Sequence, residues 1–231
     1  MSAEDFLEGQ VLLIDKPLTW SSFQAVNKLK YILKRKYDLP KKFKIGHAGT
    51  LDPLASGLLI VCTGKFTKKI TEIQSQAKEY TGTIVVGATT PSYDMETEVD
   101  ATFPTAHITE ALILETVNRF LGEIDQKPPV FSAIKKDGVR LYEHARIGAE
   151  VEIQARKTTI HEFEITRIAL PEIDFRVKCS KGTYIRSLAF DFGKALQSGG
   201  YLSVLRRTKI GEYAVENAVT PEVFEQQLTQ E

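Results

Sequence analysis

A single carboxylate in a glycine-punctuated loop is the clearest candidate for chemistry in this chain. Asp52 lies in the run Gly46-His47-Ala48-Gly49-Thr50-Leu51-Asp52-Pro53-Leu54-Ala55-Ser56-Gly57, and an apolar run at 58–62 follows it. Glycines at 46, 49 and 57 allow backbone conformations that other residues resist. A loop of this kind can hold a carboxylate at a fixed angle on a strand edge, and a carboxylate held close to its target is an adequate nucleophile. The alternative is a turn in which Asp52 only caps backbone amides.

Short, mixed elements must position this loop. Residues 11–15 read as a strand, and Ser21-Ser22 can cap a helix whose apolar residues Phe23, Val26, Leu29 and Leu33 recur at helical spacing. Further strands are expected at 58–63, 80–86, 157–180 (two strands with a turn at Pro171) and 203–215. Further helices are expected at 66–77, from the cap Thr109 to 120, near 141–147, from Thr183 to 196, and at 221–229, with a polar connection at 88–107. Without a regular βαβ rhythm, this order predicts an α+β fold with a mixed, largely antiparallel sheet flanked by helices.

The composition is that of one globular domain. The chain has 231 residues, 42% of them hydrophobic, which is enough for one substantial core. No apolar run approaches the roughly 20 residues that span a bilayer, and the acidic N-terminus has no signal-peptide core. Cys62 and Cys179 match no zinc spacing and lie in strand-like contexts, which favours buried reduced thiols. We therefore expect a cytoplasmic protein without a metal site or membrane contact.

Charge is neutral overall but uneven along the chain. The chain has 30 basic and 30 acidic residues. Residues 28–69 hold 11 Lys/Arg against 2 Asp/Glu, and residues 127–209 hold 16 against 9. Residues 94–125 hold 1 against 8, and residues 210–231 hold no base and 5 acids. This pattern favours a polarised surface with a basic face for phosphates, unless the blocks interleave in space.

Five further segments stand beside the Asp52 run. They are Val11-Leu12-Leu13-Ile14-Asp15-Lys16-Pro17, Lys78-Glu79-Tyr80, Phe131-Ser132-Ala133-Ile134-Lys135 with Leu141-Tyr142-Glu143-His144-Ala145-Arg146, Cys179-Ser180-Lys181-Gly182-Thr183-Tyr184-Ile185-Arg186, and Leu205-Arg206-Arg207-Thr208. In this order, over roughly residues 10–220, the segments together with the Asp52 run resemble the TruB family of pseudouridine synthases, which modify uridine 55 in the T loop of transfer RNA. The resemblance implies the pseudouridine synthase fold, as a single catalytic domain over 1–231 with an RNA-gripping insertion around 125–155.

The resemblance also assigns three catalytic residues. Asp52 is the nucleophile, and Arg186 pairs with it to keep it ionised in a site that excludes water. Tyr80 stacks on the flipped base. The alternative for Arg186, which we favour less, is a surface position or a contact with phosphate. Taken alone, Tyr80 fits a place in the core or at its rim.

Five more residues are assigned to substrate binding by the same resemblance. Tyr184 and Leu205 line the uracil pocket, although plain packing explains Leu205 as well. His47 fills the space that the flipped base leaves. Lys16 supports the glycine-rich loop or contacts RNA, and Asp94 holds the flipped nucleotide.

The implied function is the isomerisation of uridine 55 by base flipping, without cofactor or metal. The alternatives are the catalytic subunit of a guide-RNA pseudouridylation particle and a tRNA-folding chaperone that needs binding alone. The chain departs from many family members because it stops soon after Leu205-Arg206-Arg207, so we expect no full C-terminal PUA domain. We expect tRNA as the partner, no obligatory protein partner, and a monomer.

Overall fold

The structure is a computed structural model that describes residues 2–132, 135–136, 139–140 and 153–230. The chain forms two compact units, one of residues 1–80 with 205–231 (unit 1) and one of residues 81–204 (unit 2). Two strands, β4 (Lys78–Val86) and β12 (Gly200–Ile210), run through both units. The expected single catalytic domain stays a prediction.

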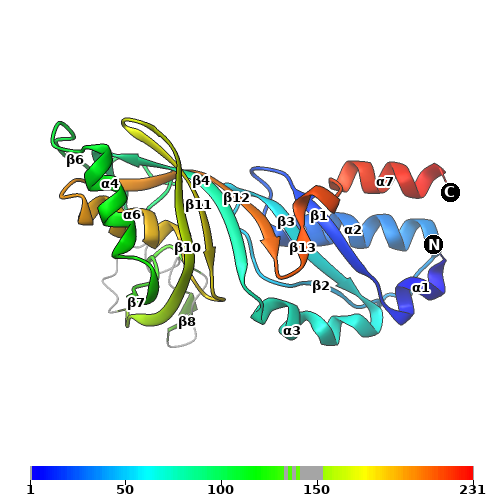
Figure 1. The fold of residues 1–231 in the computed structure, drawn as a ribbon. Coiled ribbons are helices and arrows are strands. Elements are labelled where there is room, and N and C mark those ends of the chain that lie inside the picture. The colour runs from blue at the N-terminus through cyan, green and yellow to red at the C-terminus, as the bar shows by residue number, and fades with distance from the viewer. Residues whose placement is uncertain (1, 133–134, 137–138, 141–152, 231) are drawn as a thin grey trace. The chain divides into compact units, whose positions relative to one another are not determined.

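Unit 1 is built on strands that pair both parallel and antiparallel (Figure 1). Strand β1 (Val11–Lys16) pairs antiparallel with β3 (Ala55–Thr63), and so does the short β2 (Ile45–His47). Strand β12 pairs parallel with β3, and β13 (Tyr213–Ala214) pairs antiparallel with β12. This arrangement confirms the mixed sheet that the sequence predicts.

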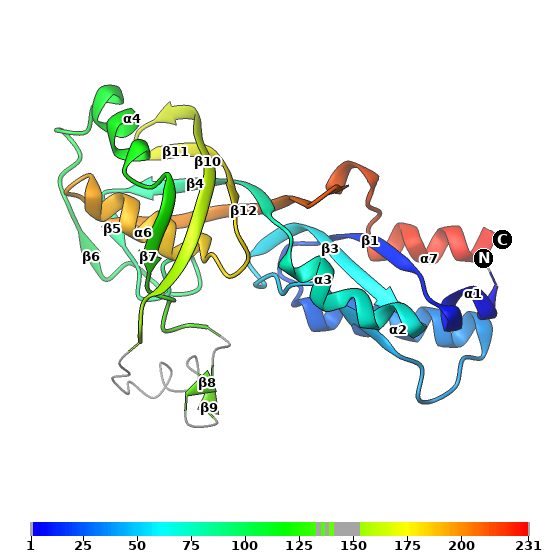
Figure 2. The same ribbon diagram turned by 60° about the horizontal axis from the view of Figure 1, so that its bottom comes forward.

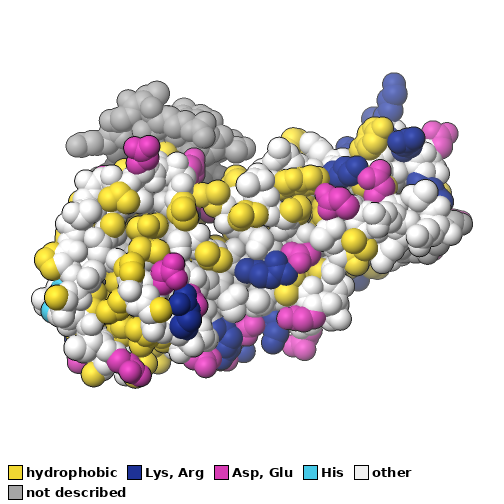
Figure 3. Space-filling model, turned by 90° about the horizontal axis from the view of Figure 1, so that it is seen from above, with side chains coloured by type: hydrophobic (Ala, Val, Ile, Leu, Met, Phe, Trp, Pro, Cys, Tyr) yellow, Lys and Arg dark blue, Asp and Glu magenta, His cyan; other side chains and the backbone are white. Residues whose placement is uncertain are grey.

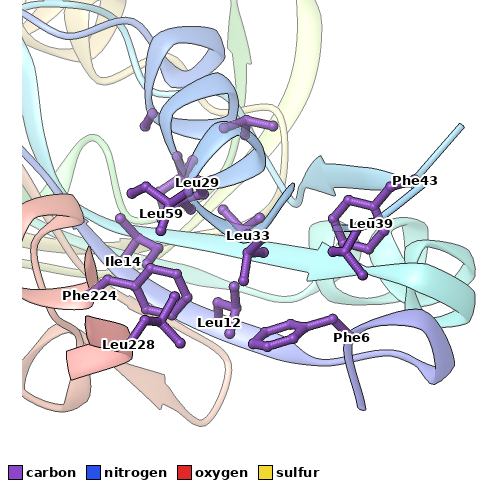
Figure 4. Packing of buried hydrophobic residues seen from close by; sticks show 14 residues of the cluster. Phe6, Leu12, Ile14, Leu29, Leu33, Leu39, Phe43, Leu59, Phe224 and Leu228 are labelled. Atoms are coloured by element: carbon purple, nitrogen blue, oxygen red, sulfur yellow. The ribbon is translucent and has the colours of Figure 1, made fainter. Parts of the chain in front are cut away.

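Both faces of these strands are covered. The helices are α1 (Ala3–Glu8), α2 (Ser22–Tyr37), the 3-10 helix η1 (Gly64–Lys69), α3 (Ile70–Ser75), the 3-10 helix η2 (Val215–Asn217) and α7 (Pro221–Gln230). On one face, α2 and α7 pack on β1 and β3 through a cluster that includes Leu29, Leu33, Phe224, Leu228, Leu12, Ile14 and Leu59 (Figure 4). On the other, the alternate residues Leu58, Ile60 and Cys62 of β3 pack with Ile73 of α3. Because β3 is apolar on both sides, it forms a rigid base for the loop that precedes it.

Helix α2 begins where the sequence predicts but buries a different face. Ser21 caps it by accepting from the Gln24 backbone N–H, and the Gln24 side chain accepts from the Ser21 backbone N–H in return. The buried stripe runs through Val26, Leu29 and Leu33 as expected, and also through Ser22, Ala25 and Ile32. At about 100° per residue, these residues centre the stripe away from Phe23. The expectation that Phe23 belongs to the buried apolar face is wrong, since Phe23 is 69% exposed.

Unit 2 is an antiparallel sheet with helices on one face (Figure 2). Its strand order is β4, β11 (Glu172–Cys179), β10 (Arg156–Ala169), β7 (Gly122–Gln126). Phe163 of β10 and Phe175 of β11 stack edge to face, and Phe163 also meets Phe192 of α6 (Ile185–Ala195) and Phe120, which follows α4 (Glu110–Asn118). Two short pairs complete the strands, β5 (Ala88–Thr89) with β6 (Ala101–Thr102) and β8 (Lys135–Lys136) with β9 (Val139–Arg140).

Most expected elements of unit 2 are confirmed. The hairpin of β10 and β11 turns at Pro171, and Thr109 caps α4 by accepting from the Leu112 N–H. The 88–107 connection is a loop apart from the β5–β6 pair. Helix α6 starts later than predicted, because Thr183 donates its hydroxyl to the Ser180 carbonyl and Tyr184 takes the cap position. The helix expected near 141–147 lies outside the described residues.

Charges from different blocks of the sequence meet in space. Lys28 pairs with Glu225 at 2.5 Å, Lys65 with Glu8 at 2.7 Å, and Lys157 with Glu123 at 2.5 Å. Figure 3 shows basic and acidic side chains near one another on the visible face. The blocks therefore interleave in part, and a purely basic face does not follow from the segregation along the sequence. Within the described part of the chain, no helix has the length and apolar character needed to cross a membrane.

Candidate active site

The Asp52 loop leads from β2 into β3 in unit 1. Asp52 is half-buried, and its carbonyl accepts from the Ala55 N–H at 3.1 Å, which closes a tight turn at the start of β3. Gly49 has φ 98° and Gly57 has φ 101°, both in the left-handed region. A Cβ on Gly57 would lie 2.3 Å from the Arg207 carbonyl oxygen. The loop therefore requires glycine at 49 and 57, as the sequence predicts, whereas Gly46 lies inside β2.

The first residue of α2 and the segment before it hold the backbone on both sides of Asp52. The Ser22 hydroxyl accepts from the Leu51 N–H at 2.8 Å and donates to the Leu51 carbonyl at 3.0 Å. The Thr19 N–H donates to the Pro53 carbonyl at 2.8 Å. Because these bonds satisfy groups immediately before and after Asp52, the carboxylate is carried on a fixed backbone.

Arg207 holds the same loop from β12, and the sequence did not single it out. It is a fully buried arginine whose Nε donates to the Leu58 carbonyl at 2.8 Å and whose Nη2 donates to the Gly49 carbonyl at 3.0 Å. The guanidinium thus joins the backbone before and after the Asp52 turn. Its motif was visible in the sequence, but its role depends on the parallel register that sets Arg207 beside Gly57.

Lys16 lies inside the protein at the end of β1. Its ammonium donates to the carbonyls of Pro17 and Trp20. Burial lowers the pKa of Lys16 to about 8, with the Asp52 charge opposing this and Arg207 adding to it. Of the two sequence-based roles for Lys16, the buried position favours support of the loop over contact with RNA.

His47 is the last residue of β2, opposite Val61 of β3. Burial, and then the Arg207 charge, lower the pKa of His47, so the imidazole is neutral near pH 7. Its Nδ1 is buried and makes no hydrogen bond to the described residues. The placement in space that the flipped base vacates stays a prediction.

Unit 2 brings together Arg186 and Asp94. Both side chains are buried, with Arg186 Nε 3.6 Å from Asp94 Oδ2. Arg186 Nη1 also donates to the Ser92 carbonyl at 3.2 Å, and Asp94 Oδ1 accepts from the Glu96 N–H at 2.9 Å. The structure therefore gives Asp94 a contact that the sequence did not suggest, and the proposed contact with the flipped nucleotide stays a prediction.

Tyr184 is fixed through its backbone. The buried side chain of Gln126, at the end of β7, accepts from the Tyr184 N–H at 2.8 Å and donates to the Tyr184 carbonyl at 3.1 Å. Next to it, the Ser187 hydroxyl donates to the Lys127 carbonyl at 2.7 Å. The chain entering the expected RNA-gripping insertion is thereby tied to the start of α6, where Arg186 lies. The middle of that insertion falls outside the described residues.

The other predicted residues lie in unit 1. Tyr80 is buried in β4, and Leu205 is half-buried in β12, opposite Ala55 of the turn that carries Asp52. Unit 1 thus holds Asp52, Lys16, His47, Tyr80 and Leu205, and unit 2 holds Arg186, Asp94 and Tyr184. The pairing of Asp52 with Arg186 stays a prediction. Within the described ranges, no three His, Cys, Asp or Glu side chains are grouped as ligands for a metal ion.

Comparison with known proteins gives consistent results. The model of the TruB family pseudouridylate synthase (N terminal domain) matches residues 34–185. A "tRNA pseudouridine synthase B" of Flavobacterium johnsoniae is 77% identical over 228 residues, covering 99% of this chain and 100% of that one. A protein of the same name from Phocaeicola vulgatus is 54% identical, covering 98% and 96%.

A solved structure supports the fold. The "Crystal Structure of a Cbf5-Nop10-Gar1 Complex" contains a chain with a TM-score of 0.72 and 28% identity. The match covers 98% of this chain but 56% of that one, so this chain spans little more than half of its length. The likeness confirms the pseudouridine synthase fold. With the family model matching well over half of its length, the chain belongs to the TruB family of pseudouridylate synthases.

Proposed function

We propose that this chain isomerises uridine 55 in the T loop of transfer RNA to pseudouridine, with Asp52 as the nucleophile. The observation that carries the proposal is the Asp52 loop, whose backbone is bound by Thr19, Ser22 and Arg207. The names of relatives that match along the whole chain support tRNA as the substrate.

The reaction needs little beyond a fixed carboxylate and a closed pocket. The N1–C1′ bond breaks, the uracil turns, and C5 bonds to C1′, while a proton leaves C5 and one is taken up at N1. Asp52 attacks C1′ directly or removes a proton from the sugar on a glycal route. In both routes the carboxylate acts as an anion, and we propose that Arg186 pairs with it to keep it ionised.

The other residues receive supporting roles in this proposal. Tyr80 stacks on the flipped uracil, Tyr184 and Leu205 line its pocket, and His47 fills the gap in the RNA stack. Asp94 orients Arg186, to judge from their 3.6 Å separation. The protein works as a monomer without partner proteins.

Asp52→Asn is expected to bind T-loop RNA and form no pseudouridine, because the amide is a poor nucleophile. The test is an assay of purified protein on an unmodified T stem-loop without guide RNA, read by chromatography of the digested RNA. Thr50→Ala, an exposed neighbour in the same loop, serves as the control. Wild-type turnover by Asp52→Asn would remove this residue from the mechanism.

The same assay separates the alternatives. Turnover that requires added guide RNA and partner proteins would support a guide-dependent particle. Accelerated tRNA folding without any turnover would support a chaperone.

A further inference from the structure

Phe23 is an exposed aromatic residue next to the candidate nucleophile loop. At 69%, its exposure exceeds that of any other large apolar residue in the described part of the chain. Leu18, five residues earlier, is 55% exposed. Single exposed apolar side chains are common and need no explanation by themselves. The position of Phe23 in the fold is what distinguishes it.

The segment between Leu18 and Phe23 is fixed to the Asp52 loop. Ser22, which precedes Phe23, exchanges two hydrogen bonds with Leu51, and the Thr19 N–H donates to the Pro53 carbonyl. From the inside, the Lys16 ammonium holds the carbonyls of Pro17 and Trp20. Phe23 therefore moves with the backbone that carries Asp52.

The backbone of this segment is also strained and capped. Thr19 has φ 70°, a left-handed conformation that costs a non-glycine residue energy and persists only where its surroundings fix it. The Ser21–Gln24 capping box fixes the first turn of α2, where Phe23 is the second residue. The backbone that carries the Phe23 ring therefore has little freedom left to lose when the ring binds a flat partner.

An unpaired nucleobase is the partner that this chemistry fits. A target base in a folded loop must leave its stack to reach a buried site, which leaves neighbouring bases unstacked. Unstacked RNA bases are bound by aromatic side chains through their faces, without sequence preference. Because RNA must approach Asp52 closely, its unpaired bases come near the segment that holds the Asp52 loop.

We propose that Phe23 is a stacking platform for an unpaired base of the substrate RNA, next to the nucleotide that enters the Asp52 site. This inference rests on the proposed function. It names a substrate-positioning residue outside the family motifs that carry the catalytic assignment.

The test compares Phe23→Ala, Phe23→Leu and Phe23→Trp in binding and turnover of a T stem-loop RNA. Loss of one base stack is expected to weaken RNA affinity and raise KM by about 5- to 150-fold for Phe23→Ala. The kcat at saturating RNA should stay near the wild-type value, because Phe23 does not touch the reacting atoms. Phe23→Trp should restore affinity and Phe23→Leu should not, which separates stacking from general apolar contact.

Tyr31→Ala is the matched control, since Tyr31 is a 59% exposed aromatic residue further along α2. A direct readout uses fluorescence, because the chain has a single tryptophan, Trp20. Phe23→Trp should show more quenching on RNA binding than the wild type, and Tyr31→Trp should not.

The outcomes are distinct. Equal RNA affinity of Phe23→Ala and wild type, with no added quenching at position 23, would overturn the inference even if uridine 55 is modified. If the wild type forms no pseudouridine, the proposed function fails, while the quenching still reports whether the ring stacks on RNA. If Phe23→Ala instead abolishes a concentration-dependent dimer and leaves RNA affinity unchanged, the ring is a contact between two copies of the chain, which also overturns the inference.

Discussion

Two buried cations, Lys16 and Arg207, support the loop of Asp52 in different ways. Arg207 binds carbonyls before and after the Asp52 turn, and Lys16 binds carbonyls of the segment that docks on it. Each replaces lost hydration with backbone oxygens, which is how a buried charge is kept. Both cations therefore act on Asp52 through the backbone that carries it, in addition to the proposed pairing of the carboxylate with Arg186.

Replacing Arg207 with lysine should separate the effect of its hydrogen-bond geometry from the effect of its positive charge. Lysine keeps the positive charge but cannot donate to the Leu58 and Gly49 carbonyls with the same planar fork. A small displacement of Asp52 is expected to lower kcat by up to about 100-fold, with RNA affinity unchanged. The measurement is single-turnover pseudouridine formation per folded molecule.

Arg206→Lys is the control, because this neighbour is half-exposed and pairs with Asp15. Equal losses in the two variants would show that β12 as a whole, and not the Arg207 fork, sets the rate.

The lowered pKa of Lys16 predicts that the stability of the folded protein depends on pH. Its pKa is about 8 in the folded protein, against an ordinary value of 10.5 in the unfolded chain. Between these values the unfolded state binds more protons, so the free energy of unfolding should rise with pH, by at most about 1.4 kcal/mol per pH unit. Below pH 8 both states are protonated, and the burial cost is fully present. Urea unfolding of wild type and Lys16→Met from pH 7 to 10 measures this, and parallel curves would contradict the shifted pKa.

At the scale of elements, signals close in the sequence predict where helices and strands start and end better than they predict which elements contact one another. The Ser21 cap, the β10–β11 turn and the strand after Asp52 follow from residues close in sequence, and all are confirmed. Phe23 was misassigned because helical spacing alone does not say where a stripe is centred. The role of Arg207 was missed because Gly57 and Arg207 become neighbours only through the parallel pairing of β3 with β12.

The start of α2 offers a test of how the docked segment works. Ser22→Ala removes both hydrogen bonds to Leu51 and leaves the Leu51 N–H buried without this partner, which costs about 1–3 kcal/mol of stability. Because the Asp52 backbone is loosened, turnover per folded molecule should also fall. Both are measured on the same protein, by urea unfolding and by the stem-loop assay.

Ser21→Ala is the matched control, since it removes the helix cap at a cost of about 1 kcal/mol but no bond to the Asp52 loop. If the two variants lose stability and turnover alike, the serine–leucine bonds have no special role in the loop.

At the scale of the whole molecule, net charge says little about RNA binding. Lysines 28, 65 and 157 are each engaged by a glutamate. A different group of lysines follows α2, where Lys41, Lys42 and Lys44 are exposed around the buried Phe43. Phe43 packs in the α2 cluster, so these lysines lie on a fixed part of unit 1. Among the residues that the structure describes, only Lys28, Lys65 and Lys157 of these six lysines pair with a glutamate, although all six carry the same formal charge.

Salt dependence of RNA affinity should distinguish these two sets. Each phosphate contact contributes roughly −0.7 to −0.9 to the slope of log affinity against log salt. The wild type should therefore show a steep slope despite its zero net charge. Substituting glutamine for Lys41, Lys42 and Lys44 in one variant should make the slope shallower by about 2 to 3 if all three contact phosphates.

The matched variant, with glutamine at 28, 65 and 157, should change the slope by less than about 1, because those charges are already balanced by glutamates. Titration of labelled T stem-loop RNA between low and physiological salt gives both slopes. Equal changes in the two variants would show that ion pairing does not decide which lysines meet RNA, and a flat wild-type slope would show that phosphates are not bound electrostatically.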